Sequence, residues 1–476
     1  MYCFISSTIL TAALLISKIT AQDDSAVITK DIVIIGGGAS GAHAAVRLRE
    51  DLDQDIILIE KQSILGGHVD SYTDPATGVH YDYGVQSFND YGKARKFFAR
   101  LGVETAIPRR FSRETQYVDF SAAQPLVNFT GPTAAAQKAA LEKYVALCEL
   151  YEYMILPGYD QFPEGGDIPE DLLMKFSDFA IKHDILDALP IMFTTTAIGM
   201  GNFTDALTLY VMQSFGGQMG RVLLGRESAM VPATFRNQDL YDAAATLLGD
   251  DVLYNTVVDT TMRTDEGVTV TVVNTEGKKT TFKAKKLLVA IVPVLDNLHG
   301  FDLDDQETGV FSRWQYNRLY AGVVQNPSLP INGTLYNLPL AAAPSNYLTY
   351  PAVSFTGRFD AYGPDVPLFR VMVTGDEQLT PRSAVSMVQS DFSNMVEAGI
   401  MPTSEKEELE FLALANHGPM GVWVTAEELR DGFVQKQYAL QGRRSTWFTG
   451  GAFAGHFQTI LWEYNEFLLP KIMESM

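Results

Sequence analysis

Short hydrophobic runs and helix-like stretches alternate at the start of the chain. The β-branched run Asp31–Ile35 predicts a buried parallel strand, and Ile56–Ile59 predicts a second one. A helix is expected between them, beginning near Gly41. Farther along, residues 167–189 and 204–215 are typical of helices, and alternation at 318–324 and 368–373 is typical of strands. The pattern predicts an N-terminal βαβ unit followed by a mixed sheet with helical cover.

Glycines follow the first predicted strand at the spacing of a nucleotide-binding loop. Gly36 permits the tight turn, Gly38 lets the backbone approach a pyrophosphate, and Gly41 permits close helix packing. The amide-bearing helix N-terminus attracts phosphates. Glu60 ends the second strand, where a carboxylate accepts hydrogen bonds from ribose hydroxyls and repels a 2′-phosphate. The sequence therefore predicts a dinucleotide site that disfavours NADP.

The chain is expected to leave the nucleotide-binding domain twice. Cofactor-type signals occupy residues 30–100, 225–300 and 440–470. Residues 101–224, predicted to be mostly helical, and residues 301–439 lack them and should form the substrate domain.

Composition and charge narrow the possible partners. At 476 residues and 46% hydrophobic content, the chain can bury a large core. The net charge of −21 argues against nucleic acid and anionic membrane surfaces as partners and is typical of a soluble protein. The expected partner is a small-molecule substrate.

The N-terminal residues resemble a processing signal. Phe4–Ile16 is apolar, and Ile19–Ala21 resembles a cleavage site, so residues 1–21 are predicted to be a signal peptide of a secreted or lumenal protein. An uncleaved anchor is the alternative, although the run is short for a stable membrane span. Three sequons, at Asn128, Asn202 and Asn332, fit a glycoprotein.

Only two cysteines are present. Loss of Cys3 with the signal peptide would leave Cys148 alone, which excludes an intramolecular disulfide and a cysteine cluster for a metal.

Several segments resemble the motifs of flavin-containing amine oxidases. Glu60 is followed by Gly66-Gly67-His68 at the family's spacing, and Asp82–Gln86 resembles the segment that passes under the isoalloxazine. Val252–Val257 and Lys285–Pro293 resemble two later strands of the family, and Trp447–Gly451 with Gln458-Thr459 resembles its closing motif. The family's arginines four and eight residues beyond the acid are replaced by Ile64 and His68.

The resemblance implies FAD as cofactor, and an α/β fold in which a Rossmann-like FAD-binding domain is interleaved with a mixed α+β substrate domain. It implies cofactor contacts at Gly36, Gly38, Ser40, Gly41, Glu60, Gly66, Gly67, His68, Gly84, Val85, Gln86, Val257, Gly450, Gly451, Gln458 and Thr459.

Within this superfamily the chain is similar to the fungal β-cyclopiazonate dehydrogenase family. The similarity is carried by Gly36–Arg49, Glu60–Ser63, Leu65–His68 and Asp74–Gly78. It implies an FAD-dependent oxidation in secondary metabolism, of the kind that closes a ring in a prenylated indole.

No second nucleotide fingerprint is found. Residues 198–203 lack the last glycine and residues 214–220 lack the spacing, so we expect the substrate itself to reduce the flavin. His456 is the candidate titratable group at the ring, as a base, a support for anionic reduced flavin, a covalent link or a loop cap. Tyr320 stands where many amine oxidases carry a lysine near flavin N5.

The leading hypothesis is an FAD-dependent oxidoreductase that removes a hydride from an organic amine or related secondary metabolite. The alternatives are a redox-neutral double-bond isomerase acting on a lipid-like substrate and a noncatalytic flavin-binding protein.

Overall fold

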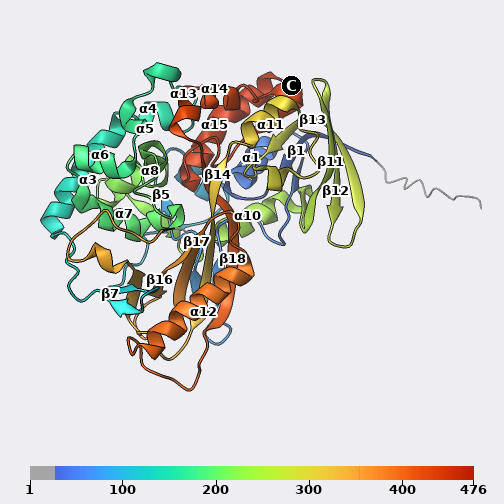
Figure 1. Cartoon of the computed structure of the whole chain (residues 1–476). Helices are drawn as coiled ribbons and strands as arrows, with labels where there is room; N and C mark the ends of the chain where they lie inside the picture. The colour runs from blue at the N-terminus through green and yellow to red at the C-terminus, as the bar shows by residue number, and fades with distance from the viewer. Residues whose placement is uncertain (1–26, 353) are drawn as a thin grey trace, which may run out of the picture.

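Two seven-stranded sheets and a layer of helices make up the fold (Figure 1). The computed structural model describes residues 27–352 and 354–476. The predicted signal peptide, residues 1–21, lies outside these residues. In Figure 1 the helices α3 to α8 lie on the left, the first sheet on the right and the second sheet below, with α12 across it.

The first sheet, called here the dinucleotide sheet, has the order β10-β2-β1-β13-β12-β11, and β19 also pairs with β13. Its strands are β1 (Ile28–Ile35), β2 (Ile56–Ile59), β10 (Val252–Leu253), β11 (Thr256–Thr264), β12 (Gly267–Asn274), β13 (Lys279–Val289) and β19 (Thr446–Phe448). Strands β10, β2, β1, β13 and β19 are parallel, whereas β11, β12 and β13 form an antiparallel ribbon.

The hydrophobic run of β1 forms a strand because both of its faces are covered. Ile32, Val33 and Ile34 have no exposed surface. Helix α1 (Ala39–Glu50) presents buried alanines, including Ala42 and Ala45, that let it approach closely. Helices α10 (Asp239–Leu248) and α15 (Gln458–Glu474) pack against α1.

The second sheet, called the substrate sheet, has the order β18-β14-β17-β16-β15-β7-β8. Its strands are β7 (Glu114–Asp119), β8 (Gln124–Pro125), β14 (Gln315–Gln325), β15 (Gly333–Asn337), β16 (Phe355–Ala361), β17 (Phe369–Gly375) and β18 (Glu410–Trp423). Its neighbours are antiparallel except β15 and β7, so the predicted mixed sheet is present. Strands β7 and β8 come from a segment predicted to be mostly helical.

One face of the substrate sheet is covered by α12 (Pro381–Glu397). The helix turns Ala384, Val388, Phe392 and Met395 toward the strands, at helical spacing. Because side chains alternate along a strand, the neighbouring residues of the sheet point to the opposite face. We call that opposite face, turned toward the helical layer, the inner face.

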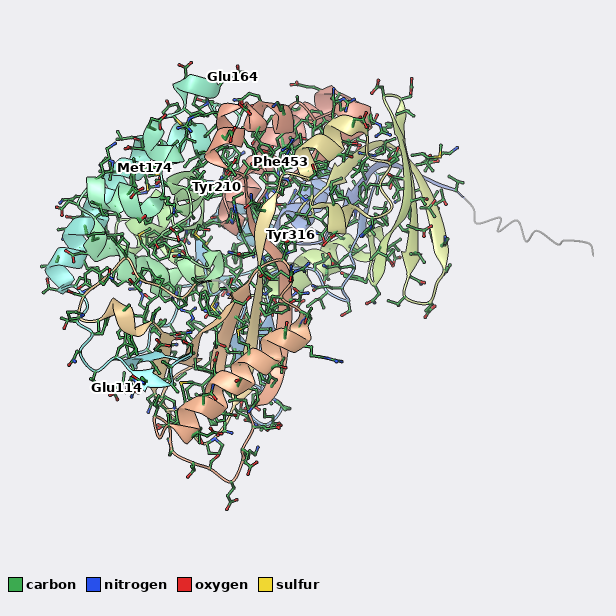
Figure 2. The ribbon with its side chains drawn as sticks, in the orientation of Figure 1. Glu114, Glu164, Met174, Tyr210, Tyr316 and Phe453 are labelled. Atoms are coloured by element: carbon green, nitrogen blue, oxygen red, sulfur yellow. The ribbon has the colours of Figure 1, made fainter. Side chains whose placement is uncertain are left out.

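The helical layer contains α3 (Ala134–Glu149), α4 (Glu152–Ile155), α5 (Glu170–Leu173), α6 (Phe176–Lys182), α7 (Leu189–Thr195), α8 (Thr208–Ser214) and α9 (Gly217–Leu223). The remaining elements are β3 (Ser71–Thr73), β4 (His80–Asp82), β5 (Phe88–Asn89), β6 (Thr105–Ala106), β9 (Ala229–Pro232), α2 (Ala94–Arg100), α11 (Asp305–Phe311), α13 (Ala426–Arg430) and α14 (Phe433–Tyr438). Side chains fill the space between the layers, and Tyr210 connects them by accepting a hydrogen bond from Val424 N at 2.9 Å (Figure 2).

The predicted α/β fold class, a Rossmann-like domain interleaved with a second mixed domain, is confirmed. Within the described ranges, no helix is both long and apolar enough to cross a bilayer.

Candidate functional site

Four parallel strands end side by side, and the residue that follows one strand is bonded to the end of its neighbour. Gly36 N donates to Ile59 O at 2.8 Å, Ala290 N to Ile35 O at 2.8 Å, and Thr449 N to Val289 O at 2.9 Å. The loops after β1, β13 and β19 therefore share one edge of the dinucleotide sheet. This carboxyl edge is where open α/β sheets bind ligands.

The glycines of the first loop have different roles. A Cβ at Gly41 would lie 1.8 Å from Gly36 O, so this position must be glycine for the helix to pack. Gly36 itself has φ +102°. A Cβ at Gly38 would meet only Gly67 Cα, at an ordinary 3.6 Å. The fold itself thus tolerates a side chain at Gly38, and the space in front of it is left for a ligand.

A second glycine pair lies against the first loop. Gly66 N donates to Gly37 O at 3.0 Å, and a Cβ at Gly67 would fall 2.9 Å from Gly38 Cα. Gly66 and Gly67 both have positive φ, +126° and +63°. Their lack of side chains permits this close approach of two loops.

Two helix N-termini point to this edge without side-chain caps. Gly38 precedes α1 and has no side chain that could cap the helix. Phe457 precedes α15, and its side chain does not cap that helix. Within the first turns, Ser40 Oγ and Thr459 Oγ1 are buried and have no hydrogen-bond partner among the described residues. Uncapped amides and orphan hydroxyls fit a ligand that carries acceptor oxygens.

The two helices are bonded to each other near these ends. Asn465 Nδ2 of α15 donates to Ser40 O at 2.7 Å, and Trp462 Nε1 donates to Ala39 O at 3.2 Å. Thr449 Oγ1 in turn donates to Asn465 Oδ1 at 2.7 Å. The closing motif is therefore bonded to the first glycine loop, more than 400 residues away in sequence.

Glu60 lies at the end of β2 with its carboxylate turned to the glycine loop. Oε2 accepts from Gly37 N at 2.6 Å and Oε1 from Gln62 N at 2.7 Å, and the residue is only 6% exposed. Each carboxylate oxygen can accept a further bond, so the group can also bind ribose hydroxyls. Val257, at the start of β11, is half exposed on the neighbouring ribbon.

The segment 82–86 folds over the residues that follow the glycine pair. Val85 N donates to His68 O at 3.0 Å, and a Cβ at Gly84 would fall 2.2 Å from the same oxygen. Asn237, which lies just before α10, donates from Nδ2 to Val85 O at 2.7 Å. Gln86 closes the segment on itself by donating to Asp82 O at 2.7 Å.

The loop before α15 completes the edge. Gly450 has φ +108°, and nothing lies within 4 Å of a Cβ built at Gly451. Gln458 Oε1 accepts from Tyr241 Oη at 2.7 Å. Gly450 also approaches Ser40, whose Oγ would be 3.9 Å from a Cβ there.

Three histidines gather beside segment 82–86. The rings of His68 and His417 stack with centroids 4.6 Å apart, and His417 Nε2 lies 2.8 Å from Asp70 Oδ2. Burial lowers the pKa of His68 to about 3 and that of His456 to about 4. His456 Nε2 is buried and has no partner in the described part of the chain. Both imidazoles are therefore neutral at neutral pH.

The expectation for Tyr320 is wrong. Its hydroxyl donates to Leu379 O at 3.0 Å, in the cluster that α12 covers. The alternation of β14 sends Leu319 and Ala321 to the inner face instead. Tyr320 is buried on the wrong side of the sheet to meet a flavin ring.

Sequence reasoning missed His417, Asp70 and two arginines of the inner face, Arg358 and Arg370. None of them belongs to a local motif. Arg370 Nε donates to Tyr83 O at 3.0 Å, which joins the substrate sheet to segment 82–86. Only the pairing of distant strands shows their place.

Comparisons with known proteins agree with this arrangement. Residues 34–101 match the family model of an NAD(P)-binding Rossmann-like domain. The chain is 31% identical over 450 residues to β-cyclopiazonate dehydrogenase of Aspergillus oryzae, covering 94% of each protein. It is 32% identical over 456 residues to the FAD-dependent oxidoreductase pigF of Monascus ruber, covering 94% of this chain and 93% of that one.

Solved structures share the fold at low sequence identity. A CLA-producing fatty acid isomerase from P. acnes gives a TM-score of 0.68 at 18% identity, over 93% of this chain and 98% of that chain. Cyclohexylamine oxidase from Brevibacterium oxydans gives 0.61 at 16% identity, over 94% and 99%. With curated relatives above 30% identical over nearly its whole length, the chain belongs to the family of fungal FAD-dependent oxidoreductases that includes β-cyclopiazonate dehydrogenase.

Proposed function

We propose that this protein removes a hydride from a nitrogen-bearing or extended-π secondary metabolite, in a site completed by FAD. The observation that carries the proposal is the meeting of two uncapped helix N-termini, with orphan hydroxyls on Ser40 and Thr459, at the edge where Glu60 lies. Such an edge fits a long, polar, anionic dinucleotide. The names of the relatives support an oxidation.

The residues divide along such a cofactor. Gly36, Gly38, Ser40 and Gly41 would bind the pyrophosphate, and Glu60 and Val257 the adenosine. Gly66, Gly67 and His68 would continue the cradle, and Gly84, Val85, Gln86, Gly450, Gly451, Gln458 and Thr459 would surround the flavin end. Bound FAD would supply a two-electron acceptor.

The chain would supply orientation and proton transfer. His456 stays neutral because burial lowers its pKa to about 4, so it can accept a proton at its unpartnered Nε2. A neutral imidazole supports the base role better than the role of a standing cation beside reduced flavin. The position of the His456 ring is further fixed by β18, which packs against it. A Cβ at Gly421 of β18 would fall 3.0 Å from His456 Cε1.

Anaerobic mixing of the purified protein with candidate metabolites, followed by flavin absorbance, tests the reaction. Lasting bleaching is the expected result. An unbleached steady state with a rearranged product would instead identify an isomerase. A colourless protein that cannot be reconstituted with FAD would exclude both.

We also propose that the mature protein begins near Gln22 and is secreted or lumenal. Asn128 is exposed, and so is Asn332, whose Oδ1 accepts from Asp365 N at 3.0 Å. Asn202 is half-buried and its Nδ2 donates to Asp205 Oδ2 at 2.6 Å, so Asn128 is the site we expect to be glycosylated first. N-terminal sequencing and glycopeptide mass spectrometry test this, and an intact Met1 on an unglycosylated protein would refute it.

A further inference from the structure

Two arginines and an aspartate lie together on neighbouring strands of the inner face of the substrate sheet. Arg358 and Asp360 lie two residues apart on β16 and so point to the same face. Arg370 of β17 stands directly opposite Asp360 in the register. Arg358 is 5% exposed and Asp360 is 8% exposed, so this pair is buried, whereas Arg370 is half-buried.

The hydrogen bonds of the two guanidinium groups go mostly to neutral acceptors. Arg358 Nη1 donates to Thr194 O at 2.8 Å, and its Nη2 reaches the Met372 sulfur at 3.1 Å. Arg370 donates to the carbonyl oxygens of Tyr83, at 3.0 Å, and Gly84, at 3.3 Å. The Asp360 carboxylate forms an ion pair with Arg358, with Oδ2 2.8 Å from Nε.

Among the described residues, Arg358 forms an ion pair with Asp360, and Arg370 forms none. Arg113 reaches the same end of β16, where its Nε donates to Ala361 O at 2.6 Å. Asp82 is a further carboxylate whose charge acts on Tyr362, and it accepts hydrogen bonds from Asn237 N and Ser71 Oγ. Burial, and after it the neighbouring Arg358, lowers the pKa of Arg370 to about 10, so both guanidiniums stay charged at neutral pH. Buried charges in proteins are normally paired one to one.

An orphan hydroxyl lies in the same group. Tyr362 Oη is buried and has no partner among the described residues. The tyrosine follows Asp360 by two positions, and its ring packs against Tyr81 with centroids 5.0 Å apart. A buried donor without an acceptor costs free energy unless a ligand satisfies it.

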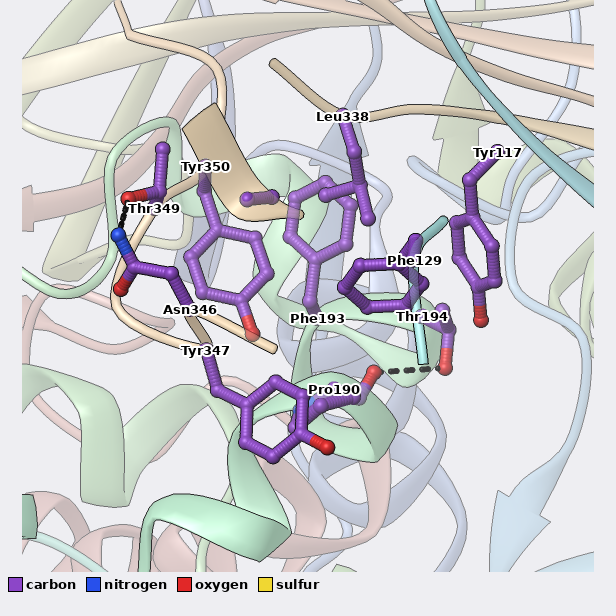
Figure 3. Close-up of a pocket in the computed structure, with 11 residues that line it drawn as sticks. Tyr117, Phe129, Pro190, Phe193, Thr194, Leu338, Asn346, Tyr347, Thr349 and Tyr350 are labelled. Atoms are coloured by element: carbon purple, nitrogen blue, oxygen red, sulfur yellow. Dashed lines mark hydrogen bonds between the residues drawn. The ribbon is translucent and has the colours of Figure 1, made fainter. Parts of the chain in front are cut away.

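An aromatic pocket adjoins Arg358. Figure 3 shows the rings of Tyr117, Phe129, Phe193, Tyr347 and Tyr350 around it. Thr194 also lines this pocket and accepts the Arg358 hydrogen bond with its carbonyl oxygen.

A second link runs through Tyr336. The Tyr336 ring stacks on the Tyr117 ring with centroids 6.0 Å apart. The Arg358 guanidinium lies 6.0 Å from the centroid of the Tyr336 ring. A chain of contacts, called here the track, thus runs from segment 82–86 through the arginines to these aromatic rings, where the cavity has a volume of only about 10 Å³.

We propose that this track binds the anionic oxygen group of a substrate beside segment 82–86, the anion being held by Arg358 and Arg370. A guanidinium presents paired donors that match a carboxylate or a delocalised oxyanion. The proposal rests on the proposed function for the reaction itself and adds the charge of its substrate.

Cinnamate and cinnamamide provide the test, because they share one shape and differ in charge. Each is titrated into the FAD-loaded protein, with isothermal calorimetry and the perturbation of the flavin spectrum as readouts. We expect cinnamate to bind at least about 10-fold more tightly, the scale of one charge-assisted hydrogen bond. Equal affinities would overturn the proposal.

Two variants separate ligand binding from structure. Arg358→Met should remove the preference for cinnamate, and Asp360→Asn should raise the affinity for cinnamate about 3- to 10-fold by removing the competing anion. If Arg358 has a purely structural role, Arg358→Met should lower the melting temperature and leave the ratio of the cinnamate and cinnamamide affinities unchanged. That result would refute the proposal. If Arg358→Met does not fold, Arg358→Lys and Asp360→Asn carry the test through the same ratio.

Arg318→Met is the matched control, since Arg318 belongs to the same sheet but donates to Glu377 O outside the track. The Arg318→Met variant should keep the preference for cinnamate over cinnamamide. FAD content, measured on denatured protein, reports separately on the proposed function, because calorimetry detects cinnamate whether or not the flavin is reduced.

Discussion

The molecule has two halves, the dinucleotide half built on the dinucleotide sheet and the substrate half built on the substrate sheet. Arginine is buried in both halves, but its charge is balanced by carboxylates in only one. In the dinucleotide half, Arg263 of β11 bonds Asp302 at 2.7 Å and Glu307 at 2.7 and 2.8 Å. Arg444 joins the same two carboxylates, which gives two cations and two anions. In the substrate half, Arg358 forms an ion pair with Asp360, and Arg370 forms none among the described residues. The balanced group joins β11 to α11, whereas the unbalanced one leaves donors for a ligand.

The largest effect is expected when the balanced group is broken. Arg263→Met should lower the free energy of unfolding by about 3–5 kcal/mol, because it leaves Glu307 buried with reduced compensation. Urea denaturation of the FAD-loaded protein measures this, and the preference for cinnamate over cinnamamide should not change. If Arg263→Met costs less stability than Arg358→Met, the contrast between the two halves is wrong.

A second variant addresses the junction between the halves. His456→Gln should keep FAD and slow the reductive half-reaction about 100-fold, the typical contribution of one positioned acid or base. Stopped-flow reduction under anaerobic conditions measures this.

The outcome also separates the roles of His456. If the histidine binds flavin covalently, acid precipitation leaves flavin on the wild-type protein and removes it from the variant. Wild-type rates with freely released flavin in the variant would show that His456 only shapes its loop. The matched control is His80→Gln. His80 lies on β4, and its Nδ1 lies 2.9 Å from Thr73 Oγ1.

A third variant confines the change to the dinucleotide half. Glu60→Ala should weaken FAD binding by about 1.5–3 kcal/mol, the scale of hydrogen bonds to a charged group. Equilibrium rebinding of FAD to the apoprotein measures it, with Glu60→Gln as the isosteric comparison. A change in the cinnamate preference of the reconstituted protein would show that the halves are not independent.

The smallest effect concerns the ion pairs between α1 and α15. Burial alone would raise the pKa of Glu466, but hydrogen bonds from Arg47 and Lys93 hold it at about 2. Because this folded-state pKa lies below the ordinary 4.5, the stabilisation is complete above pH 4.5 and is lost as the pH falls toward 2.

Glu466→Gln should therefore cost about 1–2 kcal/mol at pH 7, a figure reduced for solvent screening, and much less at pH 3. Thermal unfolding at the two pH values measures the difference. An equal cost at both values would show that the charge of Glu466 does not contribute.

Local sequence determined the dinucleotide half, because the chemistry there depends on short spacings. A hydrophobic run, glycines at Gly36, Gly38 and Gly41, and an acid at Glu60 specify a strand, a turn and a helix within about 30 residues. Backbone geometry imposes this pattern, since a Cβ at Gly41 would overlap Gly36 O. The fold class and the family could therefore be predicted.

Only the tertiary structure decided the substrate half. The strand pattern placed β14 correctly but not its register, and a shift of one residue reverses which side chains face the site, as Tyr320 shows. Arg358, Arg370 and His417 come from three strands whose pairing is not encoded in any local spacing. Their chemistry depends on which charges share a buried space, and that is fixed only when distant strands pack together.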